Sequence, residues 1–190
     1  MPTAKALMFL LLLAAPAQAE DWLTQTISRS VEGPGQAALM KLIARPDTTL
    51  SAFQTDGCSG GLSDAWRVIA HSFPDLVPAD QSRPPWEDCC ITHDRAYHNA
   101  SAATDIRRSY DARLTADVAL RACVIQNGED TAETLAQQSG LTPQQVMTAY
   151  GSIADAMFLA VRVGGMPCSG LPWRWGYGYP NCTALTGVLD

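Results

Sequence analysis

Residues 89–97, which read Cys-Cys-Ile-Thr-His-Asp-Arg-Ala-Tyr, constrain the fold of this chain more than any other segment. Two prolines and two acidic residues stand just before them, a pattern typical of the start of a helix. In a helix, Cys89, His93 and Tyr97 stack one turn apart, and Asp94 lies about 100° around the axis from His93. A potential base and a carboxylate would then address one cavity from one rigid element.

Apolar residues recur at helical spacing through most of the chain, and no stretch gives a convincing strand signal, so the fold is predicted to be mainly α-helical. The predicted helices cover residues 21–44, with a break at Gly33-Pro34-Gly35, residues 65–73, residues 87–100, residues 110–126 and a last segment between Thr142 and Gly164. Proline-rich residues 74–86 are expected to form a surface linker.

Start and stop signals set the bounds of the last two helices. Asn127-Gly128 is expected to stop the helix that begins near Tyr110, and residues 130–133 read as a capping-box start. A second capping box at residues 142–145 opens the last helix, and Gly164-Gly165 ends it. One face of that helix is predicted to carry its apolar residues, Val146, Ala149, Ile153, Met157 and Val161.

Residues 1–19 read as a signal peptide. Lys5 is their only charge, residues 6–15 are almost wholly apolar, and Ala17-Gln18-Ala19 matches a cleavage site. The apolar run is too short for an ordinary membrane-spanning helix. We therefore expect cleavage after Ala19 and a secreted or periplasmic protein whose residues 20–190 form a single domain.

Charge and cysteine content narrow the classes of function. The formal net charge is −6, and loss of Lys5 makes it −7, which argues against a nucleic-acid partner because such proteins carry a basic stripe. All six cysteines follow the predicted cleavage site, so an oxidising compartment predicts three disulfides, with fifteen pairings open. A zinc site of Cys89, Cys90 and His93 is the alternative, which export disfavours.

The central segment resembles the active-site helix of the secreted phospholipase A2 superfamily, whose shared pattern is Cys-Cys-x-x-His-Asp-x-x-Tyr. The loop of residues 56–61, Asp-Gly-Cys-Ser-Gly-Gly, resembles the calcium loop of that family. Asp117 precedes Cys123 by the spacing of the family's orienting aspartate to its cysteine. The resemblance covers residues 56–61 and 89–123.

This chain departs from the family pattern at three points. Ala96 stands where vertebrate members usually have a cysteine, which implies one disulfide fewer and no missing catalytic group. Ser59 stands where the calcium loop usually has glycine, and the interval between loop and helix is longer than usual.

The resemblance implies calcium-dependent hydrolysis of the sn-2 acyl ester of glycerophospholipids to a lysophospholipid and a free fatty acid. His93 would accept a proton from the attacking water, a task that suits its ordinary pKa of about 6.5. Asp117 would orient the imidazole, with Asp111 as the fallback. Tyr97 would hydrogen-bond the orienting aspartate, and Tyr110 is a candidate for a second such tyrosine.

Each of these residues also has a structural interpretation. A lone histidine on a helix is more often structural than catalytic. Asp117, taken alone, reads as a surface residue paired with Arg113 or Arg121 one turn away. The tyrosines read as core residues with a hydrated hydroxyl. The coincidence of the helix motif, the loop and the downstream aspartate favours the functional interpretation.

For calcium, the resemblance implies a site made of the Asp94 carboxylate and the backbone carbonyls of Gly57, Ser59 and Gly61. Ca²⁺ takes about six to eight oxygen ligands, so Asp94 alone does not suffice. Glycines allow the loop to turn its carbonyls inward, and the Ser59 N–H would help to bind the oxyanion. The alternative is an ordinary glycine-rich turn.

The resemblance also implies the disulfide pairing. Cys58 would bond Cys90, Cys89 would bond Cys123, and the remaining cysteines, Cys168 and Cys182, would bond each other. The implied fold is a disulfide-linked antiparallel helix pair with a calcium-binding loop and extra helices at both ends.

The expected partner is a phospholipid membrane or micelle surface. Trp173, Trp175, Tyr177 and Tyr179 lie between the last two cysteines, and such aromatics are favoured at membrane interfaces, although a loop packed on the helices is the simpler interpretation. Two other functions stay open: a catalytically weak phospholipase-like module that binds lipid or a partner, and a disulfide-stapled structural protein.

Overall fold

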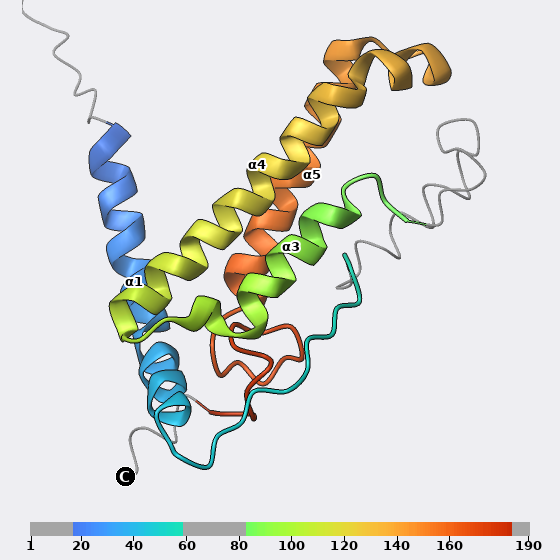
Figure 1. Ribbon diagram of the computed structural model, residues 1–190. Coiled ribbons are helices and arrows are strands. Elements are labelled where there is room, and N and C mark those ends of the chain that lie inside the picture. The colour runs from blue at the N-terminus through green and yellow to red at the C-terminus, as the bar shows by residue number, and fades with distance from the viewer. Residues whose placement is uncertain (1–16, 59–82, 184–190) are drawn as a thin grey trace, which may run out of the picture. The chain divides into compact units, whose positions relative to one another are not determined.

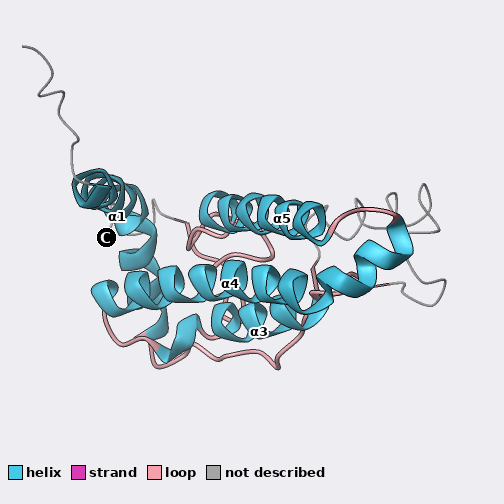
Figure 2. Cartoon of the chain, turned by 90° about the horizontal axis from the view of Figure 1, so that it is seen from above, coloured by secondary structure: helices cyan, strands magenta, loops and turns pink. Residues whose placement is uncertain are grey.

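The structure is a computed structural model that describes residues 17–58 and 83–183. The chain divides into two units, residues 1–31 and residues 32–190. In the first unit the described part is the beginning of helix α1 (Ala17–Ile43), and the rest of α1 belongs to the second unit. Within the described residues the fold is mainly α, with four α-helices and one short 3-10 helix (Figure 2).

Several predictions lie outside the described residues. These are the signal peptide, apart from the backbone of its last three residues, the helix over residues 65–73, most of the linker over residues 74–86, and the loop positions Ser59 and Gly61.

The predicted break at Gly33-Pro34-Gly35 is wrong, because α1 runs through it with Pro34 inside the helix. Proline removes one helical hydrogen bond, but packing of an amphipathic face supplies most of a helix's stability in a protein. Here Gln36 and Leu39 are fully buried, and Gly35 lies so close to Pro167 that an added Cβ would come within 2.4 Å of its carbonyl oxygen.

Helices α3 (Glu87–His98) and α4 (Ile106–Ser139) form a long antiparallel pair (Figure 1). A 3-10 turn, η2 (Ala100–Ala102), lies between them, and Asp105 caps α4 by accepting a hydrogen bond from the Arg108 N–H. The α3 face that turns inward carries Cys89, Cys90, His93, Tyr97 and His98. The predicted helix over residues 87–100 is therefore present, and its end lies at His98.

The predicted stop at Asn127-Gly128 and the predicted start at residues 130–133 are both wrong, because α4 continues to Ser139. Gly128 is buried against α5, and an added Cβ would lie 2.5 Å from the Cβ of Tyr150. The glycine therefore permits the two helices to approach closely. Helix α4 ends instead at Gly140, which has the left-handed φ of 70° that favours glycine.

Helix α5 (Pro143–Gly164) begins and ends where the sequence predicts, and both hydrogen bonds of the capping box between Thr142 and Gln145 are present. It packs along α4 (Figures 1 and 2). Its buried face differs in part from the prediction, because Ala149 is exposed while the neighbouring tyrosine is buried. The residues of α5 that are buried are Val146, Tyr150, Ala154 and Met157.

All six cysteines are paired, and the pairing is the one that the resemblance implies. Cys58–Cys90 attaches the segment before residue 59 to α3, and Cys89–Cys123 joins α3 to α4. Cys168–Cys182 closes the C-terminal loop. Three disulfides indicate an oxidising compartment.

The C-terminal aromatic loop packs mainly inward. Trp175 is fully buried, and its ring meets the Tyr97 ring edge to face at 5.0 Å. Its indole N–H donates to the Ser109 hydroxyl at 2.9 Å. Trp173, by contrast, is 43% exposed. The loop thus supports the back of α3 and leaves one aromatic ring at the surface.

Candidate active site

His93 and Asp117 face each other across the helix pair, with His93 Nε2 2.9 Å from Asp117 Oδ1. Both side chains are buried, His93 on α3 and Asp117 on α4. The Cys89–Cys123 disulfide lies one turn before the histidine and six residues after the aspartate, so it sets the register that brings the pair together. An aspartate on one imidazole nitrogen fixes the tautomer and orientation of a base.

The surface interpretation of Asp117 is wrong, because its side chain has no exposed area. Arg121 pairs with Asp155 instead. The fallback, Asp111, pairs with Arg107 one turn earlier on α4, where both side chains are well exposed. Asp111 is therefore not part of the site.

Tyr97 is a buried core residue whose hydroxyl also binds the predicted orienting aspartate. Its hydroxyl donates to Asp117 Oδ1 at 2.7 Å, and its buried ring lies 4.1 Å from the His93 ring. Tyr110 is also buried, but its ring lies beneath the guanidinium of Arg162 at 5.6 Å. The structure brings Tyr97 to the aspartate and gives Tyr110 a different neighbour.

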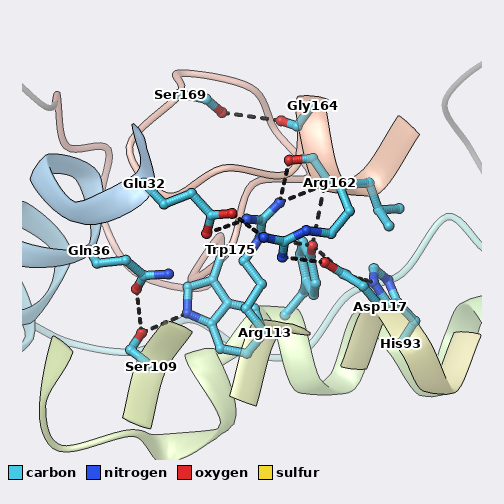
Figure 3. Close-up of polar contacts among 12 residues, drawn as sticks. Glu32, Gln36, His93, Ser109, Arg113, Asp117, Arg162, Gly164, Ser169 and Trp175 are labelled. Atoms are coloured by element: carbon cyan, nitrogen blue, oxygen red, sulfur yellow. Dashed lines mark hydrogen bonds and ion pairs between the residues drawn. The ribbon is translucent and has the colours of Figure 1, made fainter. Parts of the chain in front are cut away.

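Three charged residues lie on the Asp117 side of this pair (Figure 3): Glu32 and Arg162, which sequence reasoning missed, and Arg113, which it named only as a surface partner of Asp117. Arg162 donates from Nη1 to Asp117 Oδ2 at 2.9 Å and from Nη2 to Glu32. Arg113 donates from Nε to the Tyr97 oxygen at 3.1 Å, and its Nη1 lies 2.5 Å from Glu32 Oε2. The sequence did indicate that Arg113 and Asp117 are buried, because their spacing places them on the same face of α4 as Leu120 and Val124.

These neighbours set the protonation states. Burial alone would lower the pKa of His93, but its hydrogen bond to Asp117 and the negative charges of Asp117 and Asp94 raise it above its ordinary 6.5. Burial alone would raise the pKa of Asp117, but the His93 hydrogen bond and the Arg113 charge hold it below its ordinary value. Burial and the Asp117 charge raise the pKa of Tyr97 well above 10.0. At neutral pH Asp117 is thus ionised and Tyr97 is protonated.

Asp94 lies on the other side of the His93 ring, with its Oδ1 3.9 Å from His93 Nδ1. The Thr55 hydroxyl donates to Asp94 Oδ2 at 2.5 Å, and the Gly57 N–H donates to the Thr55 oxygen at 3.0 Å. These bonds hold the segment before Cys58 against α3. Thr55 was not singled out from the sequence, and only its place in the fold identifies it.

Gly57 has a positive φ of 69°, and an added Cβ would lie 2.0 Å from the Glu87 carboxylate. The positive φ disfavours a side chain there, and an added Cβ would require the Glu87 carboxylate to move. Among the residues that the structure describes, no group of three acidic, histidine or cysteine side chains is placed to hold a metal ion. A cation beside Asp94 would therefore depend on hydroxyl and carbonyl oxygens, the hard ligands that Ca²⁺ prefers. Of the predicted calcium ligands, Asp94 and Gly57 lie in the described residues, and the Asp94 carboxylate is an oxygen ligand of the kind that Ca²⁺ prefers.

A cavity of about 180 Å³ opens beside His93 and Asp94. Its wall is largely apolar and comes from α3, α4, α5 and the C-terminal loop. The residues that line it are Gly57, Cys58, Cys90, His93, Asp94, Leu120, Met157, Ala160, Val161, Gly164 and Trp173. A second cavity of about 250 Å³ also has Asp94 and Trp173 in its wall. Since Asp117 occupies Nε2, the Nδ1 nitrogen stays available to a group bound in the first cavity.

Comparisons of this chain with protein-family models, curated proteins and solved structures find no match. Chemically, the arrangement provides a base with one oriented nitrogen, an adjacent carboxylate and an apolar cavity. Such a set can activate water against an apolar substrate that enters the cavity.

Proposed function

We propose that this protein is a calcium-dependent phospholipase A2 that hydrolyses the sn-2 acyl ester of glycerophospholipids. The observation that carries the proposal is the buried His93–Asp117 pair at 2.9 Å beside Asp94 and an apolar cavity. The products are a lysophospholipid and a free fatty acid.

The chemistry follows from the two imidazole nitrogens. His93 Nδ1 takes a proton from water while the water oxygen bonds to the acyl carbon of the ester. Asp117, ionised and fixed on Nε2, stabilises the imidazolium that forms. The ester C–O bond then breaks, and Nδ1 returns the proton to the leaving glycerol oxygen. No acyl-enzyme forms, because water attacks directly.

Asp94 and the carbonyls of Gly57, Ser59 and Gly61 are the residues that would hold Ca²⁺. The fit rests on the partly exposed Asp94 carboxylate at the cavity wall and on the positive φ of Gly57. When bound, Ca²⁺ supplies a positive charge that offsets the negative charge growing on the ester carbonyl oxygen. The residues of the chain do the remaining work: they orient the base and line the acyl cavity.

The partner of this chemistry is a phospholipid surface. Leu159 and Val163, on the outer face of α5, are 63% and 62% exposed, and Trp173 stands at the cavity wall with 43% exposure. Among the described helices, α5 is long and apolar enough to cross a membrane by length and composition, yet it also packs on α4. The exposed side chains of Leu159 and Val163 are suited to contact with lipid.

The test is release of fatty acid from mixed phospholipid vesicles by the oxidised protein lacking residues 1–19. Three conditions are compared: wild type with Ca²⁺, wild type with EDTA, and His93→Gln with Ca²⁺. Release that requires both Ca²⁺ and His93 supports the proposal. Release that persists in EDTA or in His93→Gln overturns it.

One observation favours a second candidate, a phospholipase-like module that binds lipid with negligible turnover. Asp94 Oδ2 already accepts a short hydrogen bond from Thr55, at 2.5 Å, so a cation must share that oxygen. This candidate predicts calcium-dependent binding to vesicles without product, which the same samples report by cosedimentation.

A further inference from the structure

Two carboxylates and two guanidiniums form a buried cluster next to His93 (Figure 3). The four residues are Glu32 on α1, Arg113 and Asp117 on α4, and Arg162 on α5. Exposed fractions of the side chains are 3% for Glu32, 0% for Arg113 and Asp117, and 12% for Arg162. Buried charges persist only when they are paired, and here two negative charges face two positive ones.

The two oxygens of Asp117 have different partners. Oδ1 accepts from Tyr97 and lies 2.9 Å from His93 Nε2, while Oδ2 accepts from Arg162. A partial rotation of the carboxylate about its Cβ–Cγ bond would move Oδ1 away from the imidazole. The Arg162 hydrogen bond opposes that rotation because a charge-assisted bond is strong and directional.

Arg113 fixes the second donor to Asp117. A guanidinium has no acceptor, so its Nε must donate to the Tyr97 oxygen, and the Tyr97 proton is left to point at Asp117. Its Nη2 donates to the carbonyls of Val161 and Arg162, at 2.7 and 2.8 Å. Arg113 thereby also holds the last turn of α5, the turn that carries Arg162.

Glu32 is the common partner of both guanidiniums. Its Oε2 pairs with Arg113 and its Oε1 accepts from Arg162. With Glu32 present, Arg162 is held at two points: its Nη2 is bound to Glu32 and its Nη1 to Asp117. Without Glu32, the guanidinium would lose one of these two fixed points, which would weaken the constraint on the bond from Nη1 to Asp117.

We propose that Arg162 is a positioning residue for the orienting aspartate, and that Glu32 holds Arg162 in the geometry that does so. The inference rests on the proposed function, in which Asp117 acts on the catalytic base. Arg162 does not reach the reacting atoms. It acts by keeping Asp117 Oδ1 on the imidazole, so its removal slows the proton transfers and leaves substrate and calcium binding nearly unchanged.

A purely structural ion pair predicts different behaviour. It would lower the free energy of unfolding when broken and leave the turnover of the folded fraction intact. The useful variants are therefore Arg162→Gln, Arg162→Lys and Glu32→Gln. The matched control is Arg121→Gln, which removes an arginine from a more exposed pair with Asp155. Lysine keeps the charge but lacks the fork that spans two carboxylates.

The experiment measures kcat and KM for fatty-acid release and, by NMR, solvent exchange of the His93 Nε2 proton that is bonded to Asp117. We expect Arg162→Gln to lower kcat about 10- to 100-fold, an effect typical of losing a hydrogen bond that orients a functional side chain, with KM within about twofold. The Nε2 proton should exchange faster. Arg162→Lys should recover part of kcat, Glu32→Gln should lie between, and Arg121→Gln should match wild type.

The inference is overturned if folded Arg162→Gln, with its three disulfides formed, keeps the wild-type kcat and Nε2 exchange rate. If that variant does not fold, a wild-type kcat in both Arg162→Lys and Glu32→Gln overturns it as well. If the wild-type protein releases no fatty acid, the proposed function fails. The exchange rate of the His93 Nε2 proton then tests the positioning role of Arg162 by itself. Faster exchange in the variants then supports the positioning role, and unchanged exchange refutes it.

Discussion

The two sides of the His93 ring are built differently. On the Nε2 side, Asp117, Tyr97 and Arg113 are fully or almost fully buried and are hydrogen-bonded between packed helices. On the Nδ1 side, Asp94 is 20% exposed, and its hydrogen-bond partner comes from a loop. The first side is a product of helix packing and the second is a product of a loop. Replacing a side chain on the first side should therefore reduce stability and activity together, and replacing the Asp94 side chain on the second should reduce activity alone.

The largest effect is expected from Asp117→Asn. It removes one of the two negative charges that face the guanidiniums of Arg113 and Arg162, and loss of one partner from a buried pair costs about 3–5 kcal/mol of unfolding free energy. It also removes the charge that orients the base, which in an analogous triad costs about 10⁴-fold in kcat. Urea unfolding and vesicle hydrolysis measure the two losses. A stable variant with near-wild-type kcat would contradict the claim that Asp117 supports both the helix packing and the activity.

The two disulfides on α3 form a matched pair for the same comparison. Cys58–Cys90 and Cys89–Cys123 close segments with sequence separations of 32 and 34, so loop entropy predicts nearly equal stabilisation, about 4 kcal/mol each. Replacing Cys89 and Cys123 by alanine should lower stability and loosen the His93–Asp117 pair.

Replacing Cys58 and Cys90 should lower stability by a similar amount and chiefly weaken calcium binding. Calorimetry with Ca²⁺ and NMR exchange of the His93 Nε2 proton separate the two outcomes. Equal effects of both double variants on the Nε2 proton would show that the two sides are not independent.

Asp94→Asn tests the loop side alone. We expect loss of calcium binding and about a 10²- to 10³-fold fall in kcat, the size seen when one electrostatic stabiliser of a transition state is removed. The unfolding free energy in EDTA should change by less than about 1 kcal/mol, because a partly exposed hydrogen bond contributes little. A loss of several kcal/mol of unfolding free energy would show that Asp94 contributes to stability as the buried residues do, and would contradict the difference between the two sides of the ring.

The two sides of the His93 ring also differ in how far their residues could be predicted from the sequence. The motif over residues 89–97 and the spacing of Asp117 to Cys123 were enough to name His93, Tyr97 and Asp117, which the structure brings together on the Nε2 side. The capping box and terminal glycine were enough to bound α5. These are local signals whose geometry a helix fixes.

The remainder required knowledge of packing. Glu32 and Arg162 are 130 positions apart, and nothing local in the sequence reports that they meet. Pro34 and Gly128 carry helix-breaking signals, yet tertiary contacts keep both within helices. Glycine at position 128 has low helix propensity, but it also leaves the space that Tyr150 occupies. Local propensity therefore predicts the end of the helix at a residue that the packing of α5 on α4 requires.

Two helical glycines test that interpretation away from the site. Gly128→Ala would place a Cβ 2.5 Å from the Tyr150 side chain and should lower the unfolding free energy by about 1–3 kcal/mol. Gly151→Ala, on α5, has no atom within 4 Å of the added Cβ, so the gain in helix propensity should stabilise by about 0.5–1 kcal/mol. Thermal unfolding distinguishes the signs, and stabilisation by Gly128→Ala would refute the packing argument.

The smallest effect is a pH dependence in the calcium-free protein. The folded pKa of His93 is raised above 6.5, so its contribution to stability is complete below 6.5 and is lost as pH rises through the higher folded value. Asp117 has a lowered pKa, so its contribution is present above 3.8 and is lost as pH falls below that value. NMR titration of His93 in EDTA should give a pKa above 6.5, and a value below 6.5 would contradict the pairing with Asp117.

The central claim is that His93 and bound calcium act together on the sn-2 ester. Its most direct test is the initial rate of fatty-acid release from a phospholipid with different acyl chains at sn-1 and sn-2, with each product identified by mass spectrometry. The account predicts release of the sn-2 chain alone by wild type in Ca²⁺, and no release by His93→Gln or in EDTA. Release of the sn-1 chain, or equal rates for wild type and His93→Gln, would contradict it.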